Sequence, residues 1–527
     1  MTVAGRRAGL LIPLFSCPST LSWGIGDIGD VVPAAAWLAS AGMRVLQLLP
    51  INEMPPGEQS PYSALSAMAI DSIYIRVTDI PDAQVLGDEL LDRDERRELE
   101  NLNQTEHVEY ARVRALKNRA LQRCFDHFLD VDWARQSSRA RGLRAFVAAE
   151  AWWLDDYALF RAIHERESHR PWTDWPSPLR DREPAAMATA RRDVWRDMLF
   201  RQYLQWLAAD QWRRARVAAQ SHGVAIFGDL PFMVDRDSAD VWARQRDFHL
   251  DSSVGVPPDA FSASGQDWGM PAYNWAAIAA GGFGWLHERA RRSAALYDGY
   301  RVDHLVGFYR TYSRPRGGEL AQARFEPATE DAQLELGERV LGIFRAPGAE
   351  IVAEDLGTVP DFVRASMARL GVPGCRVFRW ERHWDLEPQT FRDPADYSAI
   401  SVAVSGTHDT EALRVWWDNA DAEERQMVAD IPTVQRLAAD RDLLAAPYVP
   451  DVCDTLLETL FAAGSALLLL PVQDVFGWSA RINEPATVKP DNWTFRLPWP
   501  CDRLDGEAGV RERRDALKAW AQRHGRL

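Results

Sequence analysis

Four acidic residues stand at the ends of short apolar segments, which is an unusual place for charged side chains. They are Asp229, Asp303, Glu354 and Asp409. A single acidic residue after a buried segment is ordinarily a helix cap. Four that converge are costly, because crowded like charges destabilise a fold unless something uses them. Such a group has a specific chemical use: one carboxylate and one protonated carboxyl group flanking a glycosidic bond can cleave it through a cationic, oxocarbenium-like state.

Two basic residues accompany the carboxyl groups and suit the same chemistry. Arg301 lies two positions before Asp303, so in an extended strand both side chains point to the same face. We expect its guanidinium to hold Asp303 ionised and oriented. His408 stands beside Asp409 and can donate to a sugar hydroxyl. If one carboxylate attacks the sugar, the pair must lie about 5–5.5 Å apart and the anomeric configuration is retained. A further carboxylate raises the pKa of the acid by repulsion and keeps it protonated.

The segments that carry these residues belong to a set of eight short, β-prone apolar runs, each followed by a helix-length stretch. The runs are Leu10–Phe15, Val45–Pro50, Val224–Leu230, Tyr297–Asp303, Glu350–Asp355, Arg376–Trp380, Ala399–Asp409 and Ala466–Asp474. Near-continuous apolar character indicates strands that are buried on both faces, as in a parallel sheet covered by helices. Eight such strands predict an α/β fold, a (β/α)8 TIM-type barrel, whose catalytic groups lie at the C-terminal ends of the strands.

Two gaps between the runs are longer than one helix. Residues 71–220 carry long Arg/Glu-rich helical patterns and predict an inserted, mostly helical subdomain after the second strand. Residues 231–290 carry Pro- and Gly-rich strings and predict an inserted active-site loop region, because a loop this long in a compact domain is usually functional. We expect residues 1–527 to form a single catalytic barrel that contains both insertions.

The composition excludes several other classes of protein. The 527 residues are 46% hydrophobic and 26% charged, as in a globular protein. No apolar run approaches the ~20 residues of a membrane helix. The net charge of −15 argues against a general nucleic-acid partner, because an acidic surface repels phosphate. Five scattered cysteines without C-x-x-C spacing indicate a reducing, cytoplasmic setting, with no zinc site and no disulfide framework.

Three local patterns admit more than one interpretation. The stretch Met1–Cys17 resembles a short lipoprotein signal, but Pro13 interrupts its apolar part, and a buried first strand is preferred. Gly24–Gly29 fits G-x-G-x-x-G, but it does not directly follow its strand, so a nucleotide site is not expected. The loop Arg481–Glu484 follows the eighth run, where it can reach a sugar groove or serve as a helix cap or interchain contact.

Several strings stand here in the same order as in a known family. They are Ser60-Pro61-Tyr62, Gly228-Asp229-Leu230-Pro231, Gly255-Val256-Pro257-Pro258-Asp259, Gly265-Gln266-Asp267-Trp268-Gly269, Arg301-Val302-Asp303-His304, Ala353-Glu354-Asp355-Leu356-Gly357 and Gly406-Thr407-His408-Asp409. Together they resemble the 4-α-glucanotransferases, the amylomaltase or disproportionating-enzyme family within the α-amylase clan. The resemblance runs from about Gly9 to Pro498, with residues 80–220 matching only loosely. Departures such as Leu305-Val306 and Thr410 leave every catalytic carboxylate in place.

The resemblance implies a role for each residue of the site. Asp303 matches the nucleophile that forms a covalent glucosyl-enzyme, and Glu354 matches the general acid/base. Asp409 matches the carboxylate that stabilises the transition state at the −1 subsite. The supporting residues of that subsite match Arg301, His408, Asp229 and an aromatic platform at Tyr62. The active-site loop that folds over bound glucan matches residues 258–268, with Pro258, Asp259, Gln266 and Trp268.

The sequence therefore predicts an enzyme that transfers α-1,4-glucan segments between maltooligosaccharides, glycogen-derived chains and glucose, through a covalent intermediate on Asp303. No cofactor or metal is implied, since one α-1,4 bond replaces another. Two alternatives stay open: a hydrolase or debranching-type enzyme of the same clan, and a non-catalytic glucan-binding barrel. The intact set of Asp303, Glu354 and Asp409 argues against the binding barrel. The loop from Pro257 to Trp268 favours transfer over hydrolysis.

Overall fold

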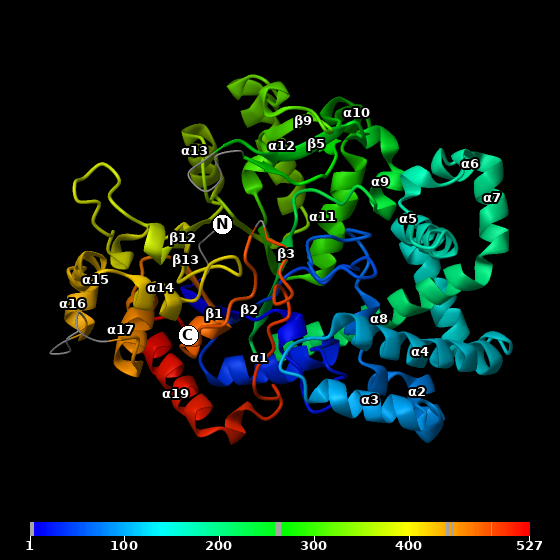
Figure 1. Cartoon of the computed structure of the whole chain (residues 1–527), viewed down its shortest axis with the longest axis horizontal. Coiled ribbons are helices and arrows are strands. Elements are labelled where there is room, and N and C mark those ends of the chain that lie inside the picture. Colours follow the sequence, from blue (N-terminus) through cyan, green and yellow to red (C-terminus); the bar gives the residue numbers. More distant parts are fainter. Residues whose placement is uncertain (1–4, 259–264, 439–442, 444–446, 486) are drawn as a thin grey trace.

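Eight parallel strands close into a barrel in the computed structural model, which describes residues 5–258, 265–438, 443, 447–485 and 487–527 (Figure 1). Around the barrel the order is β1-β14-β13-β12-β11-β8-β3-β2, and β2 pairs back with β1. The strands are β1 (Arg7–Leu11), β2 (Val45–Gln47), β3 (Ala225–Leu230), β8 (Gly299–Val302), β11 (Glu350–Ala353), β12 (Gly374–Val377), β13 (Ser401–Val404) and β14 (Leu467–Pro471). Each overlaps one predicted run, so the (β/α)8 fold class is confirmed.

Packed side chains fill the interior of the barrel. The inward-facing layer is built mainly from branched aliphatic residues, which suit strands buried on both faces: Val45, Phe227, Val352, Cys375, Val377, Val402, Val404, Leu467 and Leu469. Above it, Arg301 and His408 bound a cavity of about 20 Å³, which is room for about one water molecule. The apolar layer therefore forms the floor on which the polar side chains of the mouth stand.

Helices surround the barrel and follow its strands along the chain. The longer ones are α1 (Val31–Ser40), α8 (Trp195–Ser221), α11 (Gly284–Leu296), α12 (Glu330–Arg345), α13 (Asp361–Leu370), α17 (Pro450–Phe461) and α19 (Ala508–Arg523). The shorter ones are α9 (Ala239–Ala243), α10 (Trp275–Ala280), α14 (Leu413–Asn419), α15 (Ala422–Ala429), α16 (Pro432–Ala438) and α18 (Val472–Val475). In α17, Val452, Leu456 and Leu460 recur every four residues and are buried, as one face of an amphipathic helix requires. No helix in the described part of the chain is long and apolar enough to cross a membrane.

Between β2 and β3 the chain forms a group of helices that lies to the right of the barrel in Figure 1. They are α2 (Pro81–Leu86), α3 (Arg93–Asn103), α4 (Tyr110–Phe128), α5 (Ser138–Arg166), α6 (Ser177–Arg180) and α7 (Pro184–Asp193). Local sequence starts these helices: Asp92 and Glu95 form a capping box at α3, and Ser137 caps α5. The treatment of residues 71–220 as a separate subdomain stays a prediction.

The second insertion contains short strands, whereas the sequence predicts a loop region there. A small antiparallel sheet has the order β10-β9-β5-β6, and β4 pairs with β7 beside it. The four-stranded sheet consists of β5 (Ser252–Val256), β6 (Gln266–Asp267), β9 (Thr311–Pro315) and β10 (Arg324–Glu326). The separate pair consists of β4 (Phe248–His249) and β7 (Ala272–Tyr273). Gly255 is needed in β5, because a Cβ there would lie 1.9 Å from the carbonyl oxygen of Gln266. Strands β9 and β10 follow β8, so the sheet joins two segments that are separate in the sequence.

Candidate active site

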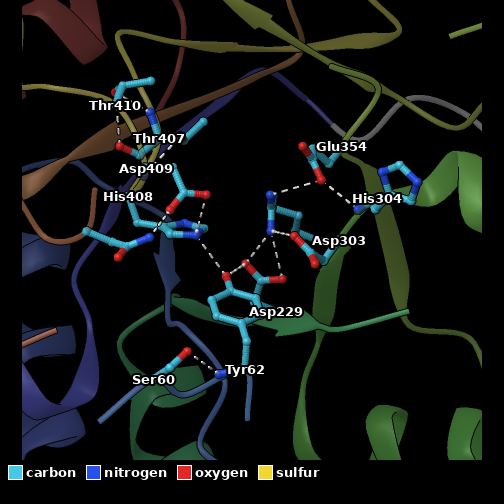
Figure 2. A network of polar contacts seen from close by, with 12 residues as sticks. Ser60, Tyr62, Asp229, Asp303, His304, Glu354, Thr407, His408, Asp409 and Thr410 are labelled. Carbon is cyan, nitrogen blue, oxygen red and sulfur yellow. Dashed lines mark hydrogen bonds and ion pairs between the residues drawn. The ribbon is translucent and has the colours of Figure 1, made fainter. Parts of the chain in front are cut away.

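The ends of four barrel strands bring the predicted carboxyl groups to one mouth (Figure 2). Asp229 lies near the end of β3, and Asp303 and Glu354 directly follow β8 and β11. Asp409 follows β13 within the same turn as His408. Figure 2 shows Asp409 and His408 on one side of the group, with Asp303 and Glu354 on the other. The barrel topology therefore gathers residues that lie as many as 180 positions apart, since 409 − 229 = 180.

Arg301, in β8, contacts three of the four carboxyl groups. Its Nη1 donates to Asp229 Oδ2 at 2.7 Å and to Asp303 Oδ1 at 3.0 Å. Its Nη2 lies 3.3 Å from Glu354 Oε2. The register of β3 and β8 sets Asp229 directly beside Arg301. Two nitrogens of one guanidinium therefore contact Asp303 and Glu354, so both carboxyl groups face the same part of the mouth.

On the other side of the mouth, hydrogen bonds connect the fourth carboxylate to Asp229. The Tyr62 hydroxyl donates to Asp229 Oδ2 at 3.0 Å and lies 3.1 Å from His408 Nε2. His408 Nε2 is in turn 3.2 Å from Asp409 Oδ2. The Tyr62 ring stacks on the imidazole, with centroids 5.4 Å apart. Since Tyr62 gives its only proton to Asp229, the Nε2 proton of His408 is available to Asp409.

The group around Arg301 is short of positive charge. Burial, with repulsion from Glu354 and Asp229, raises the pKa of Asp303 to about 8 against the opposing effect of Arg301. Burial likewise raises the pKa of Asp229. One guanidinium cannot neutralise three carboxylates, so this group retains a proton near neutral pH. That proton belongs to the coupled carboxyl groups together, and substrate contacts can direct it to the group that must act as acid.

The opposite side of the mouth stays ionised. Burial raises the pKa of Asp409, but His408 and Asn483 outweigh it and leave the pKa at about 2. Burial lowers the pKa of His408, yet Asp409 raises it above its usual value. The two sides therefore differ in protonation: a carboxylate paired with an imidazole faces a group that holds a proton. Pairs of carboxyl groups whose environments drive their pKa values apart are typical of acid/base sites.

His304 links Glu354 to the second insertion. Its backbone is left-handed, with φ of 46°, a conformation that few residues other than glycine adopt. In this conformation its backbone N–H donates to Glu354 Oε2 at 2.5 Å. The His304 ring meets Trp268 edge-on at 5.0 Å between centroids and Phe232 at 5.1 Å. Within the insertion, Trp268 Nε1 donates to Gln266 Oε1 at 3.0 Å. Through the ring contacts of His304, the insertion packs directly against the turn that holds Glu354.

One predicted loop residue, Pro258, is not brought to this group, and a second is not described by the structure. Pro258, two residues beyond β5, is exposed to solvent, and no described contact joins it to the carboxyl groups. Asp259 lies outside the described residues. Within the described ranges, no three His, Cys, Asp or Glu side chains are arranged to hold a metal ion.

The loop after β14 completes the site, and sequence reasoning left its role open. Asn483 Nδ2 donates to Asp409 Oδ1 at 2.6 Å, and Arg481 Nη2 donates to the Asp409 carbonyl at 2.5 Å. Trp493, which the sequence analysis missed, packs 5.7 Å from both the Tyr62 and His408 rings. The position of Arg481 and Asn483 just after the eighth strand is a sequence signal that could have assigned them to the site. Nothing in the sequence separated Trp493 from the rest of the 22 tryptophans of the chain.

The inserted helices hold the loop that carries Tyr62. Glu53, at the start of that loop, is buried and accepts from Arg161 Nε of α5 at 3.1 Å and from the Tyr157 hydroxyl. Gln205 of α8 exchanges two hydrogen bonds with the backbone near the end of the loop, at 3.0 and 2.7 Å. Buried polar contacts of this kind fix a loop whose own sequence has little regular structure. The helical insertion therefore positions Tyr62 without reaching the carboxyl groups itself.

The closed parallel barrel with acidic residues at its mouth places the chain among the (β/α)8-barrel enzymes. Comparison with known proteins gives the family. A family model described as 4-alpha-glucanotransferase matches residues 12–502, and the chain belongs to this family. The 4-alpha-glucanotransferase of Thermus thermophilus is 31% identical and covers 99% of both chains. That of Solanum tuberosum, described as chloroplastic/amyloplastic, is 30% identical over 98% of this chain and 86% of its own. The amylomaltase of Streptococcus agalactiae, solved with acarbose, superimposes with a TM-score of 0.82 at 26% identity, covering 99% of both chains.

Proposed function

We propose that this 4-alpha-glucanotransferase cleaves and remakes α-1,4-glucosidic bonds with Asp303 as nucleophile and Glu354 as general acid/base. One observation carries the assignment: adjacent nitrogens of the Arg301 guanidinium contact both carboxyl groups, at 3.0 and 3.3 Å. That arrangement supports one reacting centre served by both groups, as double displacement with retention requires.

In the first step Asp303 attacks C1 of a glucose unit while Glu354 gives its proton to the glycosidic oxygen. The C1–O bond breaks, a C1–carboxylate bond forms, and the reducing-side fragment leaves with the proton. Arg301 orients Asp303 and lowers its pKa, although burial outweighs this effect and raises that pKa to about 8 in this structure. The mechanism requires that bound glucan leave Asp303 ionised and Glu354 as the proton donor. The backbone N–H of His304 holds the Glu354 carboxyl in place at 2.5 Å.

In the second step a glucan 4-hydroxyl takes the place of the departed fragment. Glu354, now a carboxylate, removes its proton, and the oxygen attacks C1 to release Asp303 and restore an α-1,4 bond. Asp409 and His408 bind hydroxyls of the sugar at the −1 position, and the ionised Asp409 stabilises the oxocarbenium-like charge. Tyr62 supplies an aromatic platform beneath that sugar. No step consumes ATP or a redox cofactor.

The substrates that suit this site are neutral α-glucans: maltooligosaccharides and glycogen-derived chains as donors, with glucose or a shorter glucan as acceptor. The Streptococcus agalactiae relative binds acarbose, and we extend an α-glucan ligand to this chain on that likeness. The net charge of −15 disfavours nucleic acid. Five free, buried cysteines suit a reducing compartment, and we place the enzyme in the cytoplasm.

Incubation of the purified protein with maltotriose, followed by separation of the products, tests the proposal. Transfer gives glucose together with a ladder of oligomers longer than maltotriose. Hydrolysis, the alternative within the same clan, gives glucose and maltose without longer products. An unchanged substrate would indicate a binding barrel. Either of the last two results contradicts the proposed transfer.

Trp268 is the residue we propose to exclude water from the intermediate. Its indole packs against His304, beside the turn that holds Glu354. Excluding water favours an acceptor sugar over hydrolysis. Trp268→Ala should raise the ratio of hydrolysis to transfer in the maltotriose assay, while Trp268→Phe, which keeps an aromatic ring, should raise it less. An unchanged ratio in the alanine variant would remove Trp268 from this role.

A further inference from the structure

A surface cavity of about 310 Å³ lies between α8 and α11, away from the barrel mouth. Its wall includes Trp212, Arg213, Arg216 and Gln220 from α8, and Arg292 and Leu296 from α11. Leu296 stands three residues before the start of β8, whereas the carboxyl groups of the active site follow the end of that strand. The cavity therefore opens near the N-terminal side of the barrel and shares no lining residue with the active site.

One wall residue, Arg292, is a buried cation that makes no ion pair with a carboxylate of the described residues, although Glu150 raises its pKa from farther away. Its residue is 7% exposed, and burial lowers the pKa of its guanidinium. Its Nε donates to the carbonyl of Met68 at 2.9 Å, and its Cζ stands 5.0 Å from the ring centroid of Trp153. Among the described residues, neither of its two amino groups has a hydrogen-bond or ion-pair partner. A buried charge of this kind is costly unless a partner pairs with it.

The other cations of the wall are already neutralised. Arg216 pairs with Asp298 at 2.7 Å and also donates to the carbonyls of Ala294, Ala295 and Tyr297. Gln220 Nε2 donates to the same Asp298 carboxylate at 2.8 Å. Arg213 pairs with Asp210 at 2.7 Å. The cavity thus keeps one unpaired guanidinium, that of Arg292, on a wall whose remaining charges balance.

We propose that this cavity binds the oxyanion group, phosphate or carboxylate, of a small organic molecule. The two free amino groups of Arg292 form the fork that pairs with such a group through two parallel hydrogen bonds. Val217, an exposed residue of the same wall, offers apolar surface to the rest of the molecule. A volume of about 310 Å³ is at the low end of small-molecule sites, which suits a metabolite rather than a polymer.

The position of the cavity connects it to the loop of Tyr62. Met68, whose carbonyl accepts from Arg292, belongs to the same loop that Glu53 and Gln205 hold at either end. An oxyanion on Arg292 would neutralise the charge at this joint and fix the guanidinium between Met68 and Trp153. The proposed ligand therefore binds where one side chain joins α11, α5 and the Tyr62 loop, and not at the glucan site.

Calorimetric titration of the full chain with inorganic phosphate and with succinate, at an ionic strength held constant with sodium chloride, tests the proposal. We expect saturable binding at millimolar concentration, with one site per chain, for at least one anion. The anion that binds identifies the class, phosphorylated or carboxylic. Arg292→Gln should weaken binding by about 10- to 100-fold, the loss expected for a hydrogen bond to a charged group.

Two further variants separate the site from general charge and from misfolding. Arg291→Gln removes the same charge one position away, from an exposed side chain that packs on Trp152, and should bind like the wild type. Ala209→Phe fills the cavity from its wall and leaves Arg292 in place, so it should abolish binding even if Arg292→Gln does not fold. The proposal fails if neither anion binds saturably, or if Ala209→Phe binds as the wild type does.

Discussion

Two groups of buried charges in this molecule use the same residue types for opposite purposes. The mouth group consists of Asp229, Asp303, Glu354 and Arg301, and the N-terminal cluster consists of Asp27, Asp30, Arg76 and Lys117. The mouth group has three carboxyl groups and one cation, whereas the N-terminal cluster has two of each. Burial and Asp30 also raise the pKa of Asp27, to about 7, against Lys117 and Arg76, so a raised pKa does not by itself mark the chemical group. The two groups differ in charge balance, since only the mouth group has more carboxyl groups than cations.

The two groups also differ in access to solvent. In the N-terminal cluster Arg76 Nε donates to Asp27 Oδ1 at 2.7 Å and pairs with Asp30 as well, and no side chain of the cluster is more than 6% exposed. At the mouth the Asp303 and Glu354 side chains are 29% and 21% exposed. The unbalanced group is thus open where a substrate enters, and the balanced one is sealed.

The largest effect we expect is on rate, at the mouth. Asp303→Asn and Glu354→Gln should each lower the rate of maltotriose disproportionation by several orders of magnitude, since each removes a group that makes or breaks a bond. Stability should stay equal or rise, because each change relieves crowding of like charges. Thermal unfolding and product analysis on the same samples check both statements. Near-normal turnover of Glu354→Gln would overturn the acid/base assignment.

At the N-terminal cluster we expect the reverse pattern. Arg76→Met leaves Asp27 and Asp30 buried without their guanidinium, which should cost about 3–5 kcal/mol of unfolding free energy. The kcat of the folded protein should not change. Urea unfolding measures the loss, and Arg112→Met serves as control, since its exposed pair with Glu98 should contribute only about 0–1 kcal/mol. A lower kcat with unchanged stability would erase the distinction between the two clusters.

Asn483 sharpens the comparison, because it is neutral yet acts on a charged group of the mouth. Asn483→Ala removes the 2.6 Å hydrogen bond to Asp409, which should lower kcat/KM by about 10- to 100-fold. The acidic limb of the pH–rate profile should also shift to higher pH, because Asn483 helps to lower the pKa of Asp409 and its loss lets that pKa rise. Asn492→Ala, which loosens the same loop at Glu484, should leave that limb in place. A shift of equal size in both variants would reduce Asn483 to a structural role.

Much of the fold is predictable because the strands of a parallel barrel are buried on both faces and therefore appear in the sequence as apolar runs. The boundaries shift where local geometry intervenes. The predicted run Leu10–Phe15 continues into Pro13 and a 3-10 helix at Leu14–Ser16, so β1 (Arg7–Leu11) ends before that run does, and it also starts before it. Strands β9 and β10 were not predicted because they are short, partly exposed and polar. They pair with each other, and β9 joins them to β5, which is distant in the sequence. Tertiary pairing, not local pattern, makes them strands.

The residues of the site likewise divide into those that the sequence predicts and those that it does not. The carboxyl groups are predictable since each ends a barrel strand, and the topology then decides where they meet. Asn483 and Trp493 lie in an irregular loop whose path depends on contacts with Asp409, His408 and Tyr62. No periodicity encodes such a path. The sequence therefore indicates the residues that the barrel positions better than those that loops bring back to it.

The smallest effect we expect concerns pH and the His408–Asp409 pair. Asp409 raises the pKa of His408 above its usual 6.5, so this contribution to stability is complete below pH 6.5 and is lost as the pH rises through the folded-state pKa. The pKa of Asp409 falls from 3.8 to about 2, so its contribution is present above pH 3.8 and is lost as the pH drops. The pair should therefore stabilise the fold most between about pH 4 and 6.5.

Replacing His408 by Gln, which does not titrate, makes this window visible. The difference in melting temperature between the wild type and His408→Gln should be largest between about pH 4 and 6.5 and should shrink toward alkaline pH. The difference should be modest, because the Asp409 side chain is 38% exposed and solvent screens the pair. In Asn483→Ala the lost donor is a neutral amide, so no alkaline decline should follow. If the difference in melting temperature between the wild type and His408→Gln stayed constant into the alkaline range, His408 would not be protonated at the mouth. The mouth would then have even less positive charge than an ion pair of His408 with Asp409 implies.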